Sequence, residues 1–318
     1  MKHDYVDVLK YFQLDRDNVV CWVEDNELKI HIGDGMASWF DTILFEVPVL
    51  AIVSETYFAD KEVKPLECQD RLDSKIKLLK EQNSDIKFAD FGTRRRIAKG
   101  WQEHMLRCLK IKLPNNFIGT SNVMFAKKLN IKPIGTMAHE WIQACQALTR
   151  LRDSQKYAFQ KWADEYRGDL GIALSDTLGM GAFFNDFDMY FAKLFDGARH
   201  DSGDPYVWCD KLIKHYESMN IDPMTKTAIF SDGLDFTKAL ALHKEFKTRI
   251  RTSFGIGTNL TNDCGLEPLA IVVKMTKCDG DPVAKISDSP GKAMCNDLDY
   301  LKYLRSQFSI RLKRDVTE

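Results

Sequence analysis

His139 is the residue of this chain best suited by type and context to act as a nucleophile. It stands in Gly135-Thr136-Met137-Ala138-His139-Glu140-Trp141, one or two residues into a helix that follows a predicted strand. Beside a bound phosphate, its imidazole could accept a phosphoryl group. The His-Glu pair also begins the helices of zinc proteases. Because Gln143 stands where the second histidine ligand would be, zinc is not expected.

Three carboxylates that follow predicted strands form a second set: Asp176, Asp201 and Asp204. Such groups can hold Mg²⁺ against a diphosphate or bind ribose hydroxyls. For Asp204 there is a structural alternative, because Asp204-Pro205 has the pattern of a helix N-cap followed by proline. Asp176 could likewise cap a following helix. From the residues alone, function is favoured for Asp201, and the other two stay open.

Glycine and hydroxyl residues at further strand ends are suited to phosphate. Glycine lets the backbone approach a phosphate closely, and hydroxyl and N–H groups donate to its oxygens. Two candidate cradles are Gly255, Gly257 and Thr258, and Ser231, Asp232 and Gly233. Each alone also fits an ordinary turn, so the prediction depends on their clustering at equivalent positions.

Arginine supplies positive charge at the same ends. Arg94, Arg95 and Arg96 follow one predicted strand, and Arg199 ends another. A guanidinium group matches a carboxylate or a phosphate in a two-point contact. The alternative for the triple arginine is a solvated helix start, and at least one of the three is expected to be only that.

The elements that must position these residues alternate from about residue 87 onward, with a short strand and then an amphipathic helix. The seven strand ends are Asp90-Phe91-Gly92-Thr93, Ile118-Gly119-Thr120, Ile134-Gly135-Thr136, Ala173-Leu174-Ser175-Asp176, Arg199-His200-Asp201-Ser202-Gly203, Phe230-Ser231-Asp232-Gly233 and Phe254-Gly255-Ile256-Gly257-Thr258. Two of the helical stripes are Ile97, Trp101, Met105 and Leu109, and Phe183, Phe187, Tyr190, Phe191 and Leu194. Seven tandem units predict an α/β fold with a parallel β/α barrel, which gathers functional groups at the carboxyl ends of its strands.

The segments on either side predict a smaller, discontinuous domain. Residues 19–32 read as a hairpin around Asp25-Asn26 with one buried face, and residues 46–58 and 66–79 read as helices. Residues 269–274 and 283–286 are expected to form a second hairpin that packs with the first. The expected division is 1–85 as the N-terminal flanking segment, 86–265 as the barrel that carries the site, and 266–318 as a return to the flanking domain.

Composition favours small molecules as partners. The 318 residues include 45 Lys and Arg against 46 Asp and Glu, so no overall field would hold the protein on nucleic acid or an anionic membrane. The eight cysteines include no Cys-x-x-Cys pair and are expected to be reduced. The first residues lack the apolar core of a signal peptide, and no apolar run reaches membrane-spanning length. A cytoplasmic location is therefore expected.

Six motifs, in order along the chain, resemble those of the bacterial and fungal nicotinate phosphoribosyltransferases. They are Phe91-Gly92-Thr93-Arg94-Arg95-Arg96, Gly119-Thr120-Ser121-Asn122, residues 135–141, Arg199-His200-Asp201-Ser202-Gly203-Asp204-Pro205, Ser253-Phe254-Gly255-Ile256-Gly257-Thr258, and Asp281-Pro282-Val283-Ala284-Lys285 through Asp288-Ser289-Pro290-Gly291-Lys292. The resemblance implies an irregular β/α barrel with a flanking sheet domain built from N- and C-terminal segments. It also implies an ATP-coupled reaction that joins nicotinate to phosphoribosyl diphosphate and makes nicotinate mononucleotide for NAD synthesis.

The resemblance further implies roles for individual residues. His139 would be phosphorylated by ATP, and Asp176 and Asp201 would face the ribose and Mg²⁺. The residues expected to contact substrates are Phe91, Arg94, Arg95, Thr120, Arg199, Ser202 and Asp204. The phosphate cradles would be Ser231, Asp232 and Gly233, and Gly255, Gly257 and Thr258.

Two alternatives accompany this hypothesis. Family members begin with a further segment, carrying an Asp-x-Tyr-Lys run, that helps complete the base pocket, often across a homodimer. Since this chain starts after that point, one alternative is a truncated, catalytically impaired relative that binds a nucleotide or a partner. The other is a relative that prefers nicotinamide or quinolinate, which the Thr93-Arg94-Arg95-Arg96 loop and the His139 motif disfavour.

Overall fold

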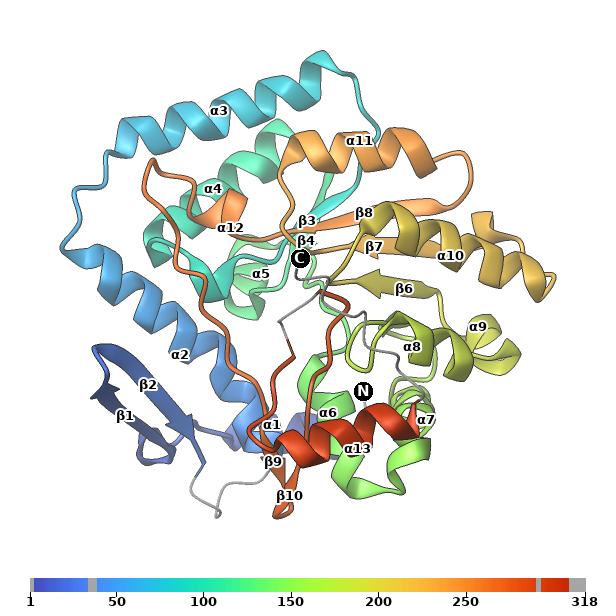
Figure 1. Ribbon diagram of the computed structural model, residues 1–318. Coiled ribbons are helices and arrows are strands. Elements are labelled where there is room, and N and C mark those ends of the chain that lie inside the picture. The colour runs from blue at the N-terminus through green and yellow to red at the C-terminus, as the bar shows by residue number, and fades with distance from the viewer. Residues whose placement is uncertain (1–2, 34–38, 290–292, 309–318) are drawn as a thin grey trace, which may run out of the picture.

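A parallel six-stranded sheet forms the centre of the computed structural model, which describes residues 3–33, 39–289 and 293–308 (Figure 1). Its strands are β3 (Phe88–Asp90), β4 (Phe117–Thr120), β5 (Ile172–Leu174), β6 (Gly197–His200), β7 (Thr227–Phe230) and β8 (Arg251–Ile256). Their order is β4-β3-β8-β7-β6-β5, and every neighbouring pair is parallel. All six carboxyl ends therefore lie at one edge of the sheet. The predicted α/β class with a parallel sheet is confirmed.

Six of the seven predicted strand ends belong to this sheet, and the seventh, Ile134-Gly135-Thr136, does not form a strand. Its segment makes only an isolated parallel bridge between Pro133 and Thr120. The N–H of Ile134 donates to the carbonyl of Thr120 at 2.9 Å, but proline has no N–H with which to continue the ladder. Among the described strands, β4 and β5 are consequently not joined, and the barrel is irregular.

Helices cover the sheet. They are α4 (Lys99–Lys112), α5 (Val123–Leu129), α6 (His139–Leu148), α7 (Ser154–Tyr166), α8 (Met180–Asp186), α9 (Met189–Leu194), α10 (Pro205–Ser218), α11 (Phe236–Phe246) and α12 (Thr258–Thr261). The predicted aromatic stripe from Phe183 runs over two short helices instead of one. The side chain of Asp188 caps α9 by accepting from the N–H groups of Tyr190 and Phe191, so the helix restarts there.

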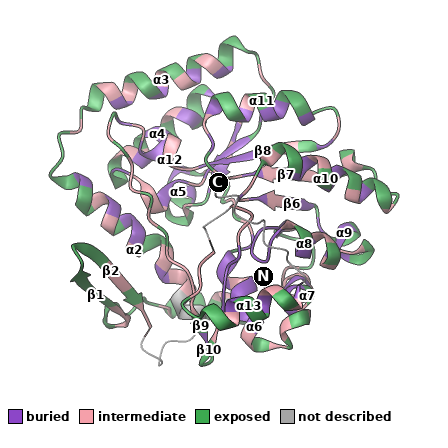
Figure 2. Ribbon diagram, viewed as in Figure 1, coloured by how far each residue is buried: buried purple, intermediate pink, exposed green. Residues whose placement is uncertain are grey.

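The core between the sheet and the helices is largely aromatic. Phe88, Phe230 and Phe254 lie on adjacent strands and are at most 1% exposed. The rings of Phe230 and Phe254 stack with their centroids 5.4 Å apart. Figure 2 shows β6 to β8 mostly in the colours of buried and intermediate residues. Burying each such side chain contributes roughly 2–3 kcal/mol, which holds the strand ends, and therefore the site, in fixed register.

The N-terminal segment contains α1 (His3–Tyr11) and the antiparallel hairpin of β1 (Val19–Glu24) and β2 (Glu27–Ile32). The turn is confirmed: Asp25 and Asn26 have φ of 51° and 62°, as a type I′ turn requires. The predicted burial of one face is wrong, because the two strands form a separate two-stranded sheet. Val23 is 73% exposed, and Figure 2 shows the hairpin as mostly exposed.

Two predicted helices join this hairpin to the barrel. They are α2 (Trp39–Ala59) and α3 (Pro65–Glu81). Pro65 occupies the first turn of α3, where its missing N–H costs no hydrogen bond. The α2 helix brings Glu46 against η2 (Thr93–Arg95), the short turn that follows β3. The N-terminal segment therefore contributes directly to the wall of the site described below.

The C-terminal segment forms a shorter hairpin than predicted. In the described part of this segment, β9 (Lys277–Cys278) and β10 (Asp281–Pro282) pair, and Lys285 makes an isolated antiparallel bridge with Met294. No strand forms at residues 269–274 or 283–286, so the long strands expected there are wrong. The two hairpins form separate sheets, and the predicted packing of strand on strand between them is not found in the described part of the chain. A smaller sheet beside the barrel is nevertheless present.

The chain continues into α13 (Leu298–Gln307). Pro290-Gly291-Lys292, the end of the last quoted motif, and residues 309–318 of the predicted return segment lie outside the described residues. The division at residues 85 and 265 stays a prediction. None of the helices that the structure describes is long and apolar enough to span a bilayer.

Candidate active site

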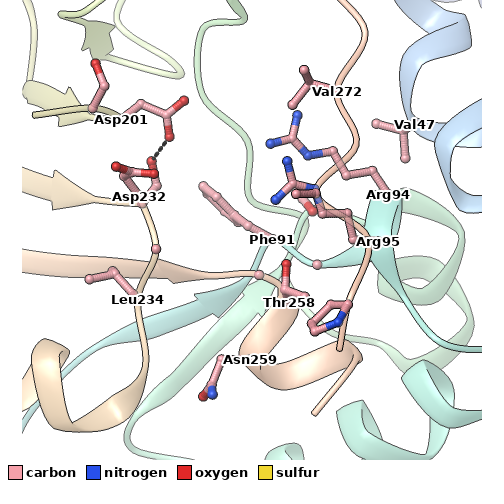
Figure 3. Close-up of a pocket in the computed structure, with 18 of the residues that line it drawn as sticks. Val47, Phe91, Arg94, Arg95, Asp201, Asp232, Leu234, Thr258, Asn259 and Val272 are labelled. Atoms are coloured by element: carbon pink, nitrogen blue, oxygen red, sulfur yellow. Dashed lines mark hydrogen bonds between the residues drawn. The ribbon is translucent and has the colours of Figure 1, made fainter. Parts of the chain in front are cut away.

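A cavity of about 1210 Å³ opens at the carboxyl ends of the strands. Its wall combines the loops after β3, β6, β7 and β8 with the start of α6, part of α2 and residues of the segment before and after β9. The predicted site residues that line it are Phe91, Arg94, Arg95, His139, Arg199, Asp201, Ser202, Ser231, Asp232, Gly233, Gly257 and Thr258. Figure 3 shows the ring of Phe91 between an acidic side with Asp201 and Asp232 and a basic side with Arg94 and Arg95.

Two residues predicted to contact substrate or phosphate lie beneath the cavity wall instead. Thr120 is fully buried, and its hydroxyl donates to the carboxylate of Asp90 at 2.8 Å. Gly255 lies against Phe91, and a Cβ there would come within 2.4 Å of the ring. Glycine is therefore required by that packing rather than by a phosphate. Both residues support Phe91 and its loop. This corrects the predicted roles of Thr120 and Gly255.

Asp204 is a helix cap rather than part of the cavity wall. Its exposed carboxylate accepts from the N–H groups of Tyr206 and Val207 at 2.8 and 3.0 Å, at the start of α10. These bonds satisfy two N–H groups that the helix leaves unpaired. The structural alternative is therefore confirmed for Asp204, and the predicted substrate contact is corrected.

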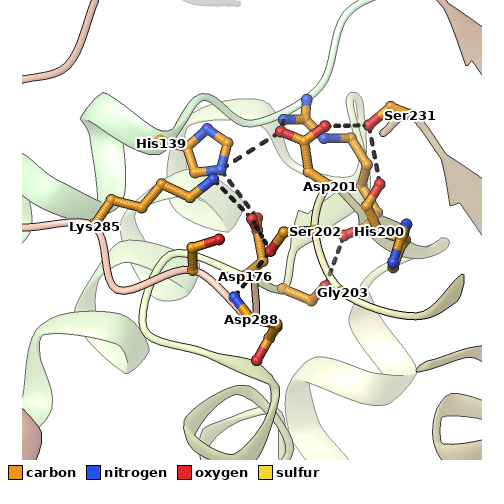
Figure 4. A network of polar contacts seen from close by, with 12 residues as sticks. His139, Asp176, His200, Asp201, Ser202, Gly203, Ser231, Lys285 and Asp288 are labelled. Atoms are coloured by element: carbon orange, nitrogen blue, oxygen red, sulfur yellow. Dashed lines mark hydrogen bonds and ion pairs between the residues drawn. The ribbon is translucent and has the colours of Figure 1, made fainter. Parts of the chain in front are cut away.

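Asp176 lies behind the wall and binds His139. Its side chain is 1% exposed, and its Oδ1 lies 3.0 Å from Nε2 of His139. Its Oδ2 accepts from the hydroxyl of Ser202 and from the ammonium of Lys285, each at 2.8 Å (Figure 4). Since Gly179 occupies the N-cap of the following helix, the capping alternative for Asp176 is wrong.

The charge of Asp176 determines which nitrogen of His139 is available. Burial alone would raise the pKa of Asp176, but His139 and Lys285 hold it well below its ordinary value. An ionised carboxylate only accepts hydrogen bonds, so Nε2 of His139 is the donor. In the neutral ring, Nδ1 then carries the lone pair. It points away from Asp176 in Figure 4, and no hydrogen bond joins it to another described residue.

Asp201 reaches the cavity beside this pair. Its Oδ2 lies 3.6 Å from Nε2 of His139 and 3.2 Å from Arg199, and its Oδ1 accepts from Ser231 at 2.6 Å. Arg199 also donates to the hydroxyl of Thr136. Burial opposes ionisation, but Arg199 and His139 keep the pKa of Asp201 lowered. With 22% of its side chain exposed, Asp201 presents a charged edge to the cavity.

The three arginines of the loop after β3 differ in their partners. Arg96 lies in a pair with Glu55 at 2.6 Å, away from the cavity, so it is the structural member of the three. Arg94 is paired with Glu46 at 2.8 Å. Arg95 lines the cavity with no carboxylate within 4 Å among the described residues, and burial and the charge of Arg94 lower its pKa. Arg95 is therefore the arginine most available to an anion.

The chain that carries this arrangement of histidine, carboxylates and cations has relatives among known proteins. The family model described as the nicotinate phosphoribosyltransferase (NAPRTase) family matches residues 86–312. The chain belongs to this family. The predictions of an enzyme, and of a place in NAD biosynthesis, are thereby confirmed, as is the resemblance on which they rested.

Individual relatives agree with the family match. The nicotinate phosphoribosyltransferases of Acidovorax sp. (strain JS42) and Burkholderia mallei (strain ATCC 23344) are 53% and 55% identical to this chain, with 98% of it covered and 80% and 79% of their own lengths. The crystal structure of the Vibrio cholerae enzyme superposes with a TM-score of 0.94 at 43% identity, over 98% of this chain and 77% of that one. For the Porphyromonas gingivalis enzyme the values are 0.90, 34%, 97% and 81%.

The charged residues of the cavity wall that sequence reasoning missed include Glu46, Glu140, Lys274 and Lys285. Glu140 and Lys285 stood in quoted motifs, which were the available signals. Glu46 and Lys274 lie in segments read as an ordinary helix and a strand. Their importance comes from contacts between distant segments, such as the 3.2 Å pair of Lys274 with Glu140.

A pH-dependent contact secures the segment that carries Lys285. Both carboxylate oxygens of Asp288 accept from the N–H of Met180, at 2.8 and 3.1 Å, and burial raises the pKa of Asp288 to about 6. Since this pKa exceeds that of the unfolded chain, the stabilising effect of protonated Asp288 is complete below pH 4 and is lost as the pH rises through 6. In urea unfolding, Asp288→Asn should gain roughly 2 kcal/mol relative to wild type between pH 4.5 and 7.5. A pH-independent difference would contradict this.

Proposed function

We propose that this enzyme joins nicotinate to the ribosyl carbon of phosphoribosyl diphosphate, releases diphosphate, and couples the synthesis to ATP hydrolysis through a phosphorylated His139. The observation that carries the coupling is the His139–Asp176 contact, which leaves a lone pair on Nδ1 beside a cavity lined by cations and hydroxyls. That is the arrangement expected of a histidine nucleophile whose tautomer is fixed by a carboxylate.

The phosphoryl step follows from this geometry. Nδ1 of His139 attacks the terminal phosphorus of ATP, the bond to the bridging oxygen breaks, and ADP leaves. The imidazolium that forms still donates its Nε2 hydrogen to the carboxylate of Asp176. The negative charge of that carboxylate stabilises the positive ring. Water later attacks the same phosphorus and releases phosphate. Each turnover therefore consumes one ATP and regenerates the neutral imidazole.

In the glycosyl step, charge neutralisation is expected to dominate. As the bond from the ribosyl carbon to diphosphate breaks, positive charge develops on the sugar ring and negative charge on the leaving group. Arg199 and Arg95 are the cations that face the leaving group or the base. Asp201 accepts from ribose hydroxyls, and Phe91 packs on the pyridine ring. Ser231 to Gly233, with Gly257 and Thr258, hold the 5′-phosphate.

The carboxylates that face the cavity fit Mg²⁺ better than Asp176 does. The nearest ligand atoms of His139, Asp176 and Asp201 lie within 4.8 Å of one another. Asp176 is 1% exposed behind the cavity wall and is paired with the ammonium of Lys285, so it does not fit a metal. Asp201 and Asp232, which face the cavity, would hold Mg²⁺ together with substrate phosphates. When bound, the ion would neutralise diphosphate charge.

Arg95 provides a test of base recognition. Arg95→Leu removes the loop arginine that has no acidic partner, and it should raise the KM for nicotinate about 10- to 100-fold, because a charged hydrogen bond is lost. Arg96→Leu is the matched control, since Arg96 is paired with Glu55 outside the cavity. It should alter stability while leaving the KM of the folded enzyme within about twofold. Equal KM changes in the two variants would contradict the assignment.

The first experiment is formation of nicotinate mononucleotide by the purified chain from nicotinate, phosphoribosyl diphosphate and Mg²⁺, with and without ATP. Product that increases with ATP supports the proposal. A folded sample that makes no product under either condition would favour the catalytically impaired relative. Product with nicotinamide or quinolinate in place of nicotinate would overturn the substrate assignment.

We also propose that the enzyme is a cytoplasmic homodimer. All eight cysteines are free, as expected in a reducing compartment. Exposed apolar residues on β1 and α2, including Trp22 at 44% and Ile52 at 65%, supply a surface that a second copy could bury. Sedimentation at micromolar concentration distinguishes a dimer from a monomer, and a purely monomeric species would overturn this part.

A further inference from the structure

A second charged cluster lies on the wall of the cavity that His139 lines. The ammonium of Lys274 lies 3.2 Å from Glu140 and 3.7 Å from Glu46, and Glu46 is paired with Arg94 at 2.8 Å. All four side chains line the same cavity as His139. They come from four separate parts of the chain: α2, the loop after β3, the start of α6 and the stretch before β9.

The cluster is buried as well as charged. The side chains of Lys274 and Glu140 are 6% and 7% exposed, and that of Glu46 is 15% exposed. Burial opposes the ionisation of Glu140, yet Lys274 and His139 keep its pKa lowered, so a negative charge stands next to His139. An unpaired carboxylate in such a place would repel phosphate and carboxylate ligands and would be costly to bury.

Lys274 is the group that compensates this charge. It is the one cation within 4 Å of the carboxylate of Glu140 among the described residues. Glu140 is the second residue of α6 and directly follows His139. Val272, two residues before Lys274, lies beside Arg94 and Arg95 in Figure 3, so the same segment borders the region assigned to the base. A single ammonium thus connects the start of α6 with the arginine side of the cavity.

We infer that Lys274 is a positioning residue for the reaction, which neutralises Glu140 and Glu46 so that anionic substrates can approach His139. This inference rests on the proposed function, since it takes the substrates to be polyanions. It differs from direct binding of a substrate by Lys274, because the ammonium acts through the two carboxylates. The distinction can be tested, since removal of the carboxylate charge should then compensate for removal of the lysine.

The experiment compares wild type with Lys274→Met, Glu140→Gln and the double variant. Lys274→Met should raise the KM for phosphoribosyl diphosphate about tenfold or more, because Glu140 is left unpaired. It should also slow the labelling of His139 by ATP. The double variant should recover most of both losses, and Glu140→Gln alone should change the KM less than threefold. Thermal unfolding of each variant controls for folding.

Two outcomes would overturn the inference. If the double variant is as impaired as Lys274→Met, the lysine acts directly on the substrate. If Lys274→Met has wild-type kinetics, the reaction does not need Lys274 to neutralise Glu140 and Glu46. Should Lys274→Met fail to fold, the double variant must still fold and react, and its failure to do so would also count against the inference. A wild-type enzyme that makes no nicotinate mononucleotide would instead contradict the proposed function, before any variant is compared.

Discussion

Replacing His139 by asparagine is expected to remove ATP-stimulated turnover, with a loss of about 10³-fold or more in the coupled rate. Asparagine keeps a side chain that can donate to Asp176, but it has no lone-pair nitrogen for a phosphoryl group. Folding should be intact, because His139 is the first residue of α6 and its side chain makes polar contacts to described residues through Nε2 alone. The measurement is nicotinate mononucleotide formation with and without ATP, together with acid-labile ³²P labelling of the protein.

A matched control is His104→Asn. His104 is exposed and lies on α4, where its Nε2 contacts Gln69 at 2.7 Å, and it is not one of the residues that line the cavity. This variant should keep wild-type labelling and turnover. Unchanged ATP stimulation in His139→Asn would contradict the assignment of His139 as the phosphoryl acceptor. Loss of labelling in the control as well would point to a folding defect.

Replacing Asp176 by asparagine is expected to reduce both stability and catalysis. The amide would leave Lys285 as an uncompensated buried cation and would present N–H groups to His139. Removing one partner of a buried ion pair costs about 3–5 kcal/mol, so the midpoint of urea unfolding should fall clearly. With the tautomer of His139 no longer fixed, labelling by ATP should fall by about 10²-fold or more in the protein that stays folded.

The control for this change is Asp204→Asn. Asn caps a helix as well as Asp does, so stability should stay within about 0.5 kcal/mol of wild type and turnover within about twofold. This result would also verify that Asp204 is a cap. If Asp176→Asn is as stable and as active as Asp204→Asn, then Asp176 is not the residue that orients His139.

The position of the site was predictable from local sequence because parallel strands place their carboxyl ends together. Twelve of the sixteen predicted site residues line one cavity, which follows from short strands that each end in Gly, Ser, Thr, Asp or Arg. Each of the four exceptions is explained by the contacts that the residue makes in the folded protein. Thr120 and Gly255 lie under the Phe91 loop, Asp204 caps a helix, and Asp176 is covered by Lys285 and Ser202.

The chain's own sequence determined the class of fold, the turn of the N-terminal hairpin, the loops that form the cavity and the histidine at its edge. These features depend on periodicity and on residue types within a few positions of each other. Only the tertiary structure decided that Pro133 interrupts the seventh strand, that Arg96 has a carboxylate partner while Arg95 has none among the described residues, and that Lys285 and Lys274 pair with Asp176 and Glu140. The charge pairs join residues more than 40 positions apart, and a Coulomb interaction is fixed by distance in space rather than along the chain.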